Sequence, residues 1–511
     1  MRLSFFSILT LLLLPLFAVA IWPAPTSSSL GSAPLTFSDT LTLTSTYTNS
    51  DRLNRATDRY LDVLQNSSSD DGVITELVLI LASSDESLSQ ATDYGYNVSS
   101  NTASITITAS TIYGAMYALE SLVQLSSHPS LPLSISDSPR YNHRGFMVDT
   151  GRRFVTVPLL LNQLDAMAIF KMNVMHLHFA DWCRYAIESA SFPELTAALT
   201  GEQAGFYTTV QVRQIIEYAN DRGIRVIPEI DLPGHSTWGT PLAGEKLEYC
   251  TASFPPSLLD DASNTTLTTL QTLVKEIVAV FGEQSDMVHI GADETATLDD
   301  EGCTIENIAG LESKIMDYIV SLDKKPVVWE EGYFKSGGAE GFQGKAIINA
   351  WNAGPRPADI EAAGFDAIES LSDNFYLNNH PSASDVWADI SAGDGDYDQV
   401  GLLGGEVSMW TDNYCYEAQC GQFGPGQPLP VGSALYSPSK DSEFARSFSA
   451  MVWPKAAIGG GAFWRYFEMT EEEVGAVSDA IVDVLESRGL DVCPKGCQCD
   501  EVTRCGENYI Q

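Results

Sequence analysis

The chain has 511 residues, and its 67 acidic residues against 28 lysines and arginines give a formal net charge of −39. Such an excess of negative charge argues against binding to nucleic acids or to anionic membrane surfaces. The length exceeds one ordinary domain and suffices for a barrel with a smaller partner domain.

The first twenty residues are typical of a secretory signal peptide. Arg2 is the charged start, residues 8–18 form an apolar core, and Ala18-Val19-Ala20 is an A-x-A cleavage site. A membrane anchor is the alternative reading, but the apolar run is short for a span of about 20 residues. We therefore expect entry into the secretory pathway, with the extracellular space or a lysosome or vacuole as destination.

Residues 21–139 predict one small α+β domain. Residues 77–81 form a buried type of strand, and residues 103–108 alternate with period two, as a half-buried strand does. Residues 111–125 then carry apolar side chains at helical spacing. This segment contains no catalytic constellation, so we expect a supporting role for it.

Strands and helices alternate through residues 140–490, and this pattern predicts an α/β fold with a (β/α)8 TIM barrel. The expected strands are 145–149, 173–179, 225–230, 287–291, 326–329, 346–351, 366–371 and 402–410. Helical patterns include 159–168, 210–222, 267–280 and a closing helix at 471–485. The fifth and sixth strands are joined by a short glycine-rich segment, where we expect an irregular helix.

Carboxylates and aromatic residues gather where these strands end. In such barrels the chemistry lies at the C-terminal ends of the strands. Indole rings offer flat faces for the C–H groups of a pyranose, which favours a carbohydrate site, although tryptophans that merely fill the top of the barrel are the alternative. The residues are Asp149, Asp181, Asp231, Asp293, Glu294, Trp329, Trp351, Tyr376, Trp410 and Asp412.

The stretch VHIGADET, residues 288–295, is the most informative of these strand ends. Gly291 and Ala292 are small, which would let a ligand approach the backbone. Asp293 and Glu294 follow directly. Two crowded carboxylates repel each other when both are ionised, so one of them should hold its proton to a higher pH, and such splitting suits general acid/base catalysis.

Nine cysteines in a secreted chain indicate disulfides, whose connectivity the sequence leaves open. Cys415 and Cys420 are spaced for a short loop, and residues 491–511 form a cysteine-rich tail. A zinc knuckle is the alternative for this tail, but no histidine lies near it. Three N-x-[ST] sequons, at Asn66, Asn97 and Asn264, indicate N-linked glycans.

The order of the motifs along the chain resembles glycoside hydrolase family 20, the β-N-acetylhexosaminidases. The resemblance covers nearly the whole mature chain. The motifs are NHRGFMVDTGRRF (142–154), NVMHLHFAD (173–181), RVIPEIDLPGH (225–235), VHIGADET (288–295), PVVWEE (326–331), AIINAWN (346–352), FYLN (375–378) and GGEVSMWTD (404–412). The small domain resembles the one that precedes the family's barrel.

The resemblance implies an exo-glycosidase that removes terminal β-linked N-acetylhexosamine, GlcNAc or GalNAc, with retention of configuration. Members of the family use the substrate's own acetamido oxygen as nucleophile and pass through an oxazolinium ion. Carried over, Glu294 is the general acid and then the base, Asp293 holds the acetamido N–H and stabilises the cation, and Tyr376 orients the acetamido oxygen. The partner is thus a glycan; no cofactor and no metal are implied, and a homodimer is an open expectation.

The other motifs supply the walls of the expected site. Arg144 matches an arginine that holds the sugar's ring hydroxyls, and Asp412 matches an acidic residue on the opposite edge. Trp329, Trp351 and Trp410 match an aromatic box around the N-acetyl group. Asp181 and His235 match polar residues that support the catalytic pair, and Asn378 flanks Tyr376.

The sequence also departs from the family's pattern. Leu177 stands where the second strand usually has Trp, Trp182-Cys183 replaces Asp-Gln, and Asp412 replaces the usual Glu. Residues 459–464 replace the family's usual Ala-Glu-Arg-Leu-Trp. The resemblance implies a Cys250–Cys303 disulfide. If Cys415 also pairs with Cys420 and the four cysteines of the tail pair with one another, Cys183 is left as the odd thiol.

Two other functions are weighed against this one. A catalytically silent glycan-binding protein on the same scaffold is the alternative, but it would have lost the acid, whereas Asp293, Glu294 and Tyr376 are all present. A metal-dependent hydrolase is suggested by the H-x-H pair of His176 and His178. No complementary histidine or lysine set follows on later strands, and the resemblance makes this pair structural.

Overall fold

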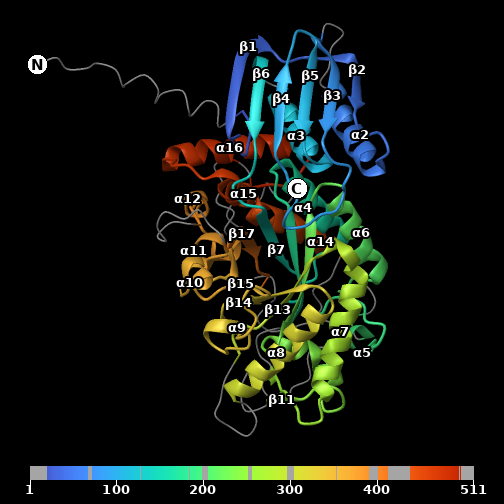
Figure 1. Cartoon of the computed structure of the whole chain (residues 1–511), viewed down its shortest axis with the longest axis vertical. Coiled ribbons are helices and arrows are strands. Elements are labelled where there is room, and N and C mark those ends of the chain that lie inside the picture. Colours follow the sequence, from blue (N-terminus) through green and yellow to red (C-terminus); the bar gives the residue numbers. More distant parts are fainter. Residues whose placement is uncertain are drawn as a thin grey trace, which may run out of the picture.

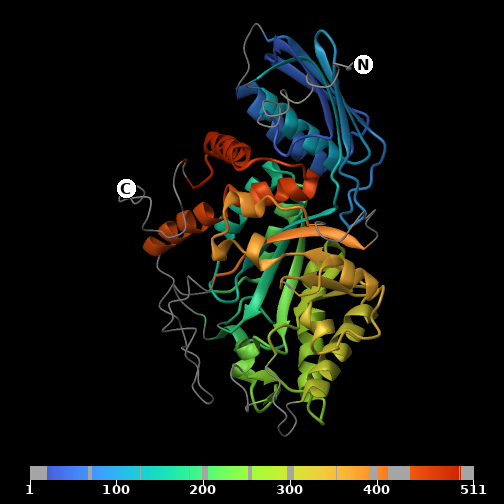
Figure 2. The ribbon, with the colours of Figure 1, turned by 90° about the vertical axis from the view of Figure 1, so that its left-hand side faces the viewer.

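The computed structural model describes most of the chain as two packed units, a small N-terminal domain and a barrel (Figures 1 and 2). The described residues are 20–66, 72–126, 128–182, 184–197, 199, 205–250, 256–295, 304–352, 354–390, 401–411, 438–493 and 495. Most of the predicted signal peptide and of the cysteine-rich tail thus lies outside the described residues. So do Cys183, Cys303, Cys415 and Cys420, and their pairing stays a prediction.

The N-terminal domain is of the predicted α+β class, and its described residues form a six-stranded sheet with two helices, of which the sequence analysis names two strands and one helix. Its strands run in the order β1-β6-β4-β5-β3-β2. Their bounds are β1 Ser27–Pro34, β2 Phe37–Ser45, β3 Ile74–Leu81, β4 Tyr96–Ser100, β5 Ser104–Ala109 and β6 Pro129–Asp137. Helices α2 (Asp51–Asn66) and α3 (Ile112–Leu125) accompany it, and α3 is buried along its whole length. The boundary at residues 139 and 140 stays a prediction.

The second sheet contains eight parallel strands among the described residues and closes on itself through the pairing of β8 with β10. Each matches a predicted strand, with ends that differ by a few residues. The bounds are β7 His143–Asp149, β8 Val174–Asp181, β10 Arg225–Leu232, β13 Met287–Gly291, β14 Lys325–Trp329, β15 Ile347–Ala350, β16 Asp366–Glu369 and β17 Leu402–Met409. The two-residue strand β9 (Arg184–Tyr185) pairs with β8 outside the barrel.

Helices cover the outside of this barrel, and each of them carries polar as well as apolar residues, as helices with one buried face do. The longer ones are α4 Val157–Ile169, α6 Thr209–Asn220, α7 Thr265–Phe281, α8 Ile305–Ser321, α14 Pro438–Val452, α15 Lys455–Arg465 and α16 Glu471–Ser487. The connection after β14 is short, as expected: α9 spans only Glu331–Phe334. Among the described residues, every helix is too short or too polar to cross a bilayer.

The barrel interior is layered. Side chains from the first three residues of six strands close its N-terminal end: Val174, Ile227, Met287, Val327, Ile347 and Ile368. An aromatic cluster of Met147, Trp329, Tyr376 and Trp410 lies at the other end. The polar and aromatic chemistry is therefore concentrated where the strands end, on top of an apolar base.

Each of the two units contributes one tryptophan to the hydrophobic core of the other. Trp464, from α15 of the barrel, packs in the core of the N-terminal domain and donates a 3.0 Å hydrogen bond to Asp137. Trp22, from the start of the described chain, packs in the barrel core and donates to the carbonyl of Ala457 at 2.8 Å. Figure 2 shows α15 and α16, in red, between the N-terminal sheet and the barrel.

Candidate active site

The adjacent acids Asp293 and Glu294 lie directly after β13 and differ sharply in exposure. The Asp293 side chain is 11% exposed, whereas that of Glu294 is 54% exposed. Ala292 and Glu294 both have positive φ angles, of 74° and 45°. Non-glycine residues rarely adopt this conformation, and such strain is concentrated at functional sites. The turn therefore directs two neighbouring carboxylates into different surroundings.

The space beside Gly291 is filled, contrary to the expectation that a ligand approaches the backbone there. A Cβ atom built on Gly291 would lie 1.8 Å from Oδ1 of Asp231. Ala292 is likewise fully buried. The small residues thus make room for a carboxylate of the neighbouring strand β10, which the sequence pattern could not indicate.

A chain of polar contacts connects Asp181, His235 and Glu294. Nδ1 of His235 lies 3.2 Å from Oδ1 of Asp181, and Nε2 lies 3.1 Å from Oε2 of Glu294. The same Nε2 is 3.9 Å from Asp293. The ring of Trp182 stacks on His235 with centroids 5.1 Å apart. An imidazole held between two carboxylates is well placed to carry a proton.

These contacts separate the pKa values of the two acids. Burial, more than any other cause, raises the pKa of Asp293. The hydrogen bond from His235 is the main cause that lowers the pKa of Glu294. Burial alone would lower the pKa of His235, but Asp181 and Asp293 outweigh it and raise that pKa well above its ordinary value. The pKa values of the two acids are split, as the sequence predicts, but the main causes are burial and His235 rather than the mutual repulsion of the carboxylates. Without substrate the proton resides on His235 rather than on Glu294.

Arg144 is not at this site, and the prediction that it holds the sugar is wrong. It lies at the beginning of β7, the opposite end of the strand, and is fully buried. Its guanidinium donates to the carbonyls of Tyr141 and Lys171 and lies 5.0 Å from the ring centroids of Tyr94 and Trp464. Arg144 therefore joins the barrel to the N-terminal domain.

Arg152 is the arginine that the structure brings to the site instead. Its guanidinium contacts Asp149 at 3.1 Å and Asp181 at 3.0 Å. It also lies 4.8 Å from the ring centroid of Trp410. Arg152 stands three residues after the end of β7, so the rule that sites form at strand ends would have selected it over Arg144.

Two of the predicted aromatic residues flank Tyr376, and a third packs behind them. The ring of Trp351 is nearly parallel to that of Tyr376, at 9° and 6.0 Å, and Trp410 lies 5.7 Å from the same ring. Trp329 packs against Trp410 at 5.9 Å and is fully buried. Burial, and next the charge of Asp293, raises the pKa of the Tyr376 hydroxyl, which therefore stays a donor.

Two glutamates that the sequence analysis did not single out hold Trp351. Oε2 of Glu331 accepts a 2.9 Å hydrogen bond from its indole nitrogen, and Oε2 of Glu330 accepts its backbone N–H at 2.8 Å. Burial, with the charge of Asp293 as the next cause, raises the pKa of Glu331 to about 7. The charge of Asp293 therefore affects the protonation of both glutamates that follow β14.

Below the aromatic cluster, buried histidines pair with two glutamates. Glu229 contacts His176, His178 and His289 at 3.0, 2.6 and 3.1 Å. Glu406 contacts His176 at 2.7 Å and His143 at 3.0 Å. Ligand atoms of His176, Glu229 and His289 lie within 4.8 Å of one another, which is compatible with a metal ion.

This group does not suit a hydrolytic metal. Its three members are fully buried, and Trp329 covers it, with its ring 4.8 Å from that of His289. A catalytic metal keeps a coordination position open to water and substrate. His176 of the H-x-H pair belongs to this buried group, and His178 is also fully buried, between Glu229 at 2.6 Å and Asp181 at 2.7 Å.

Two predicted site residues remain without a defined role. Asn378 lies next to Tyr376 in the short helix η4 (Leu377–Asn379), with its Nδ2 3.5 Å from Oδ1 of Asn379. Asp412 lies outside the described residues, so its place opposite the sugar stays a prediction. Cys250 is disulfide-bonded, but Cys303, its expected partner, is also outside them.

Comparison with known families gives matches over most of the chain. The model of the glycosyl hydrolase family 20 catalytic domain matches residues 141–419, and that of the family's domain 2 matches residues 18–137. The β-hexosaminidase subunit beta of Mus musculus is 31% identical over 386 residues, which are 67% of this chain and 69% of the relative. Subunit A1 of the Dictyostelium discoideum β-hexosaminidase is 29% identical over 375 residues, 66% and 68% of the two chains.

Solved structures share the fold. The Flavobacterium johnsoniae chitobiase superimposes with a TM-score of 0.72 at 23% identity, over 92% of this chain and 73% of its own. The Streptomyces plicatus N-acetyl-β-hexosaminidase gives 0.71 at 21% identity, over 93% and 96%. The barrel with its preceding small domain is thus an architecture seen in solved enzymes.

Proposed function

The chain belongs to glycosyl hydrolase family 20 and is a β-N-acetylhexosaminidase, and on this premise we propose that it removes terminal N-acetylhexosamine with retention, by substrate-assisted catalysis. The acetamido oxygen of the substrate attacks C1 and the glycosidic C1–O bond breaks. Water then opens the resulting oxazolinium ion. Two inversions at C1 restore the original configuration.

The observation that carries the proposal is the different surroundings of two adjacent carboxylates. Glu294 is half-exposed and is paired with His235, whereas Asp293 is buried near Tyr376 and the aromatic residues. Neighbours in sequence cannot bracket one glycosidic bond from opposite faces, as an acid and an enzymic nucleophile must. A substrate that supplies its own nucleophile removes this requirement.

Proton transfer is the role we assign to Glu294 and His235. Bound substrate would cover Glu294 and exclude water, and loss of water raises the pKa of a carboxyl group. The proton on Nε2 of His235 then passes to Oε2 of Glu294, 3.1 Å away, and from there to the leaving oxygen. Asp181 stabilises the imidazolium that carries the proton in the meantime. In the second half of the reaction Glu294 takes a proton from water.

The acetamido group is the part that we assign to Asp293 and Tyr376. Asp293 accepts the acetamido N–H, and its negative charge stabilises the developing cation when it is ionised. The Tyr376 hydroxyl donates to the acetamido oxygen and orients it. The parallel rings of Trp351 and Tyr376, with Trp410, offer apolar faces for the acetyl methyl and the pyranose.

Arg152 takes the role first expected of Arg144. Its guanidinium is only 11% exposed and is held by Asp149 and Asp181, so it is fixed before substrate arrives. A fixed donor loses little entropy on binding a sugar hydroxyl. Asp412 on the opposite edge and Asn378 beside Tyr376 complete the proposed set of substrate contacts.

Passage through the secretory pathway is a separate part of the proposal. It is supported by the charged start, apolar core and A-x-A site of residues 1–20 and by the sequons at Asn66, Asn97 and Asn264. The destination is the extracellular space or a lysosome or vacuole, and a homodimer is the proposed assembly.

The proposal is tested by NMR of the product as it first forms. The β-glycoside of N-acetylglucosamine should release the β-anomer before mutarotation. A thiazoline analogue of the cyclic intermediate should bind far more tightly than free N-acetylglucosamine, and Asp293→Asn should weaken that binding. A first-formed α-anomer would refute the mechanism, and so would equal turnover of a glucoside that lacks the acetamido group.

A further inference from the structure

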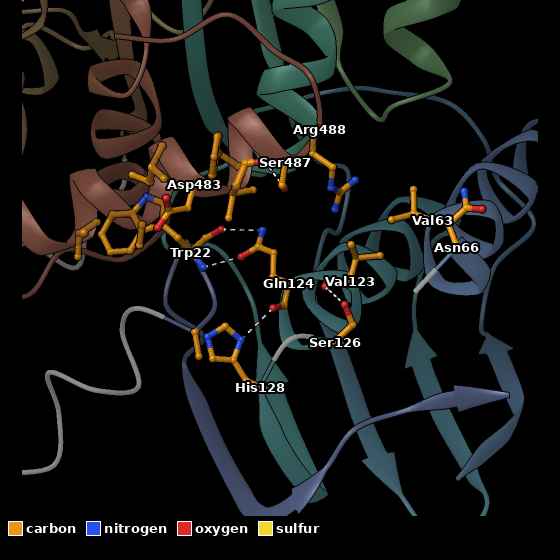
Figure 3. Close-up of a pocket in the computed structure, with 16 residues that line it drawn as sticks. Trp22, Val63, Asn66, Val123, Gln124, Ser126, His128, Asp483, Ser487 and Arg488 are labelled. Carbon is orange, nitrogen blue, oxygen red and sulfur yellow. Dashed lines mark hydrogen bonds between the residues drawn. The ribbon is translucent and has the colours of Figure 1, made fainter. Parts of the chain in front are cut away.

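A pocket of about 800 Å³ lies at the junction of the N-terminal domain and the barrel (Figure 3), and none of the residues that line it belongs to the site described above. Its volume is within the range of about 300–1,000 Å³ that is usual for small-ligand sites. Helices α2 and α3 contribute to one side and α16 to the other. Residues that line it include Trp22, Val63, Asn66, Gln124, His128 and Arg488.

The floor of this junction pocket is apolar and fixed. Phe170 and Ile481 are buried there. The backbone N–H of Trp22 donates to Oε1 of Gln124 at 2.8 Å, and Nε2 of Gln124 donates back to the carbonyl of Trp22 at 3.2 Å. A preorganised apolar floor of this kind costs little to occupy.

The edge of the pocket is polar and carries both signs of charge. Asp483 is 64% exposed, and Arg488 is 20% exposed and paired with Glu120 at 3.2 Å. His128 lies on the opposite side, with its Nδ1 3.3 Å from the carbonyl of Gln124. An apolar floor with donors and acceptors along the edge suits a pyranose, which has C–H faces and a rim of hydroxyls.

Asn66 stands at this edge and begins an N-x-[ST] sequon, Asn66-Ser67-Ser68. It lies three residues after Val63 in the last turn of α2, and residues with this spacing share a helix face. Val63 is partly buried against the pocket, whereas the Asn66 side chain is exposed. The amide nitrogen is therefore open to modification while its helix face points to the pocket.

The other two sequons differ in position. Asn97 lies on the exposed face of β4, and Asn264 precedes α7 with a φ of 57°. Neither of them lines the junction pocket. A sugar on either residue would extend into solvent, whereas a sugar on Asn66 begins at the pocket edge.

We propose that Asn66 carries an N-linked glycan whose innermost N-acetylglucosamine residues occupy the junction pocket. A lipid pyrophosphate-linked oligosaccharide is the donor: the bond from C1 to Nδ2 of Asn66 forms, the bond from C1 to the pyrophosphate oxygen breaks, and the amide proton leaves to a base. The sugars pack their C–H faces on the apolar floor, and their hydroxyls and acetamido groups meet His128, Asp483 and Arg488. The glycan would thus tie α2 to α16. The inference rests on the proposed passage through the secretory pathway.

The test uses the full chain secreted from a eukaryotic host with high-mannose glycans. An endoglycosidase that cuts between the two core N-acetylglucosamines is added under native conditions, and mass spectrometry follows each glycopeptide. We expect cleavage at Asn66 to be about tenfold slower or more than at Asn97, with equal rates after denaturation. Equal native rates, or an unmodified Asn66 in a protein glycosylated at Asn97 or Asn264, would overturn the inference.

Two variants of α16 test whether the protection of Asn66 depends on the pocket. Ala480→Trp fills the pocket but keeps the sequon, so cleavage at Asn66 should become as fast as at Asn97. Asp479→Trp, at an exposed neighbour that does not line the pocket, is the matched control and should leave Asn66 protected. Protection that persists in Ala480→Trp would also overturn the inference. If no sequon is modified, the secretory proposal fails as well, whereas the turnover measurements on the active site stay independent of both.

Discussion

The indole nitrogen of Trp351 donates a 2.9 Å hydrogen bond to Oε2 of Glu331, so a wall of the proposed acetamido site is held by an acid whose pKa is raised to about 7. Burial is the main cause, and Asp293 is the next. One carboxyl group therefore couples the charge of the catalytic pair to the position of an aromatic ring.

Glu331 should make the stability of the protein fall as pH rises. Between its ordinary pKa of 4.5 and about 7 the folded chain holds a proton that the unfolded chain has lost, so the stabilisation is complete below pH 4.5 and is lost through pH 7. The shift corresponds to about 3 kcal/mol at most. Glu331→Gln keeps an acceptor for Trp351 but cannot titrate.

We expect the unfolding free energy of wild type minus that of Glu331→Gln to decrease by about 1–3 kcal/mol between pH 4.5 and 8. Urea denaturation at several pH values measures it. Glu340→Gln, at an exposed position on the same connection, is the control and should show no such trend. A difference that does not vary with pH would contradict the assignment.

Glu294→Gln should reduce kcat/KM by about 100-fold or more for a disaccharide with a poor leaving group. The loss should be much smaller for an activated aryl glycoside, because its leaving group needs little protonation. Parallel kinetics on chitobiose and on a dinitrophenyl glycoside measure this. Losses of the same size on both substrates would exclude Glu294 as general acid.

His235→Gln should move the alkaline limb of the kcat/KM profile to lower pH. In the wild type the His235–Glu294 pair keeps its proton up to the raised pKa of His235. In the variant only Glu294 carries it, and a carboxyl group loses a proton at lower pH than an imidazole. We expect a shift of about one pH unit or more; an alkaline limb at the wild-type position would show that the limb belongs to another group.

Arg152→Met should reduce catalytic efficiency, whereas Arg144→Met should reduce stability. In Arg152→Met the substrate loses a hydrogen bond from a charged donor of the protein. The lost hydrogen bond costs about 1.5–3 kcal/mol of binding free energy, or roughly 10–100-fold in kcat/KM. Loss of Arg144 should lower the melting temperature and leave kcat/KM of the folded enzyme nearly unchanged. Thermal unfolding and kinetics on both variants decide; the reverse pattern would restore Arg144 as the sugar contact.

The strands of the barrel could be predicted to within a few residues because each is a buried apolar run that ends in turn residues. The acidic and aromatic residues at the strand ends could likewise be identified, because each directly follows such a run. Met287–Gly291, for example, is both the strand predicted from the sequence and the strand in the structure. Local patterns of this kind are set by the sequence within one strand.

Arg144 and Arg152 show what local patterns cannot supply. Whether an arginine serves the site or the domain junction depends on the aromatic residues that surround it, and Tyr94 and Trp464 come from distant segments. Glu331 was missed for the same reason: its raised pKa arises from burial and from Asp293, which follows a different strand, β13.

The exchanged tryptophans make the two units mutually dependent. Removing either unit would leave the other with a hole the size of an indole ring, and Trp→Ala losses in a core cost about 3–5 kcal/mol. Trp22 and Trp464 thus act as reciprocal anchors. On heating, the small domain should not melt ahead of the barrel, and calorimetry should record a single cooperative transition.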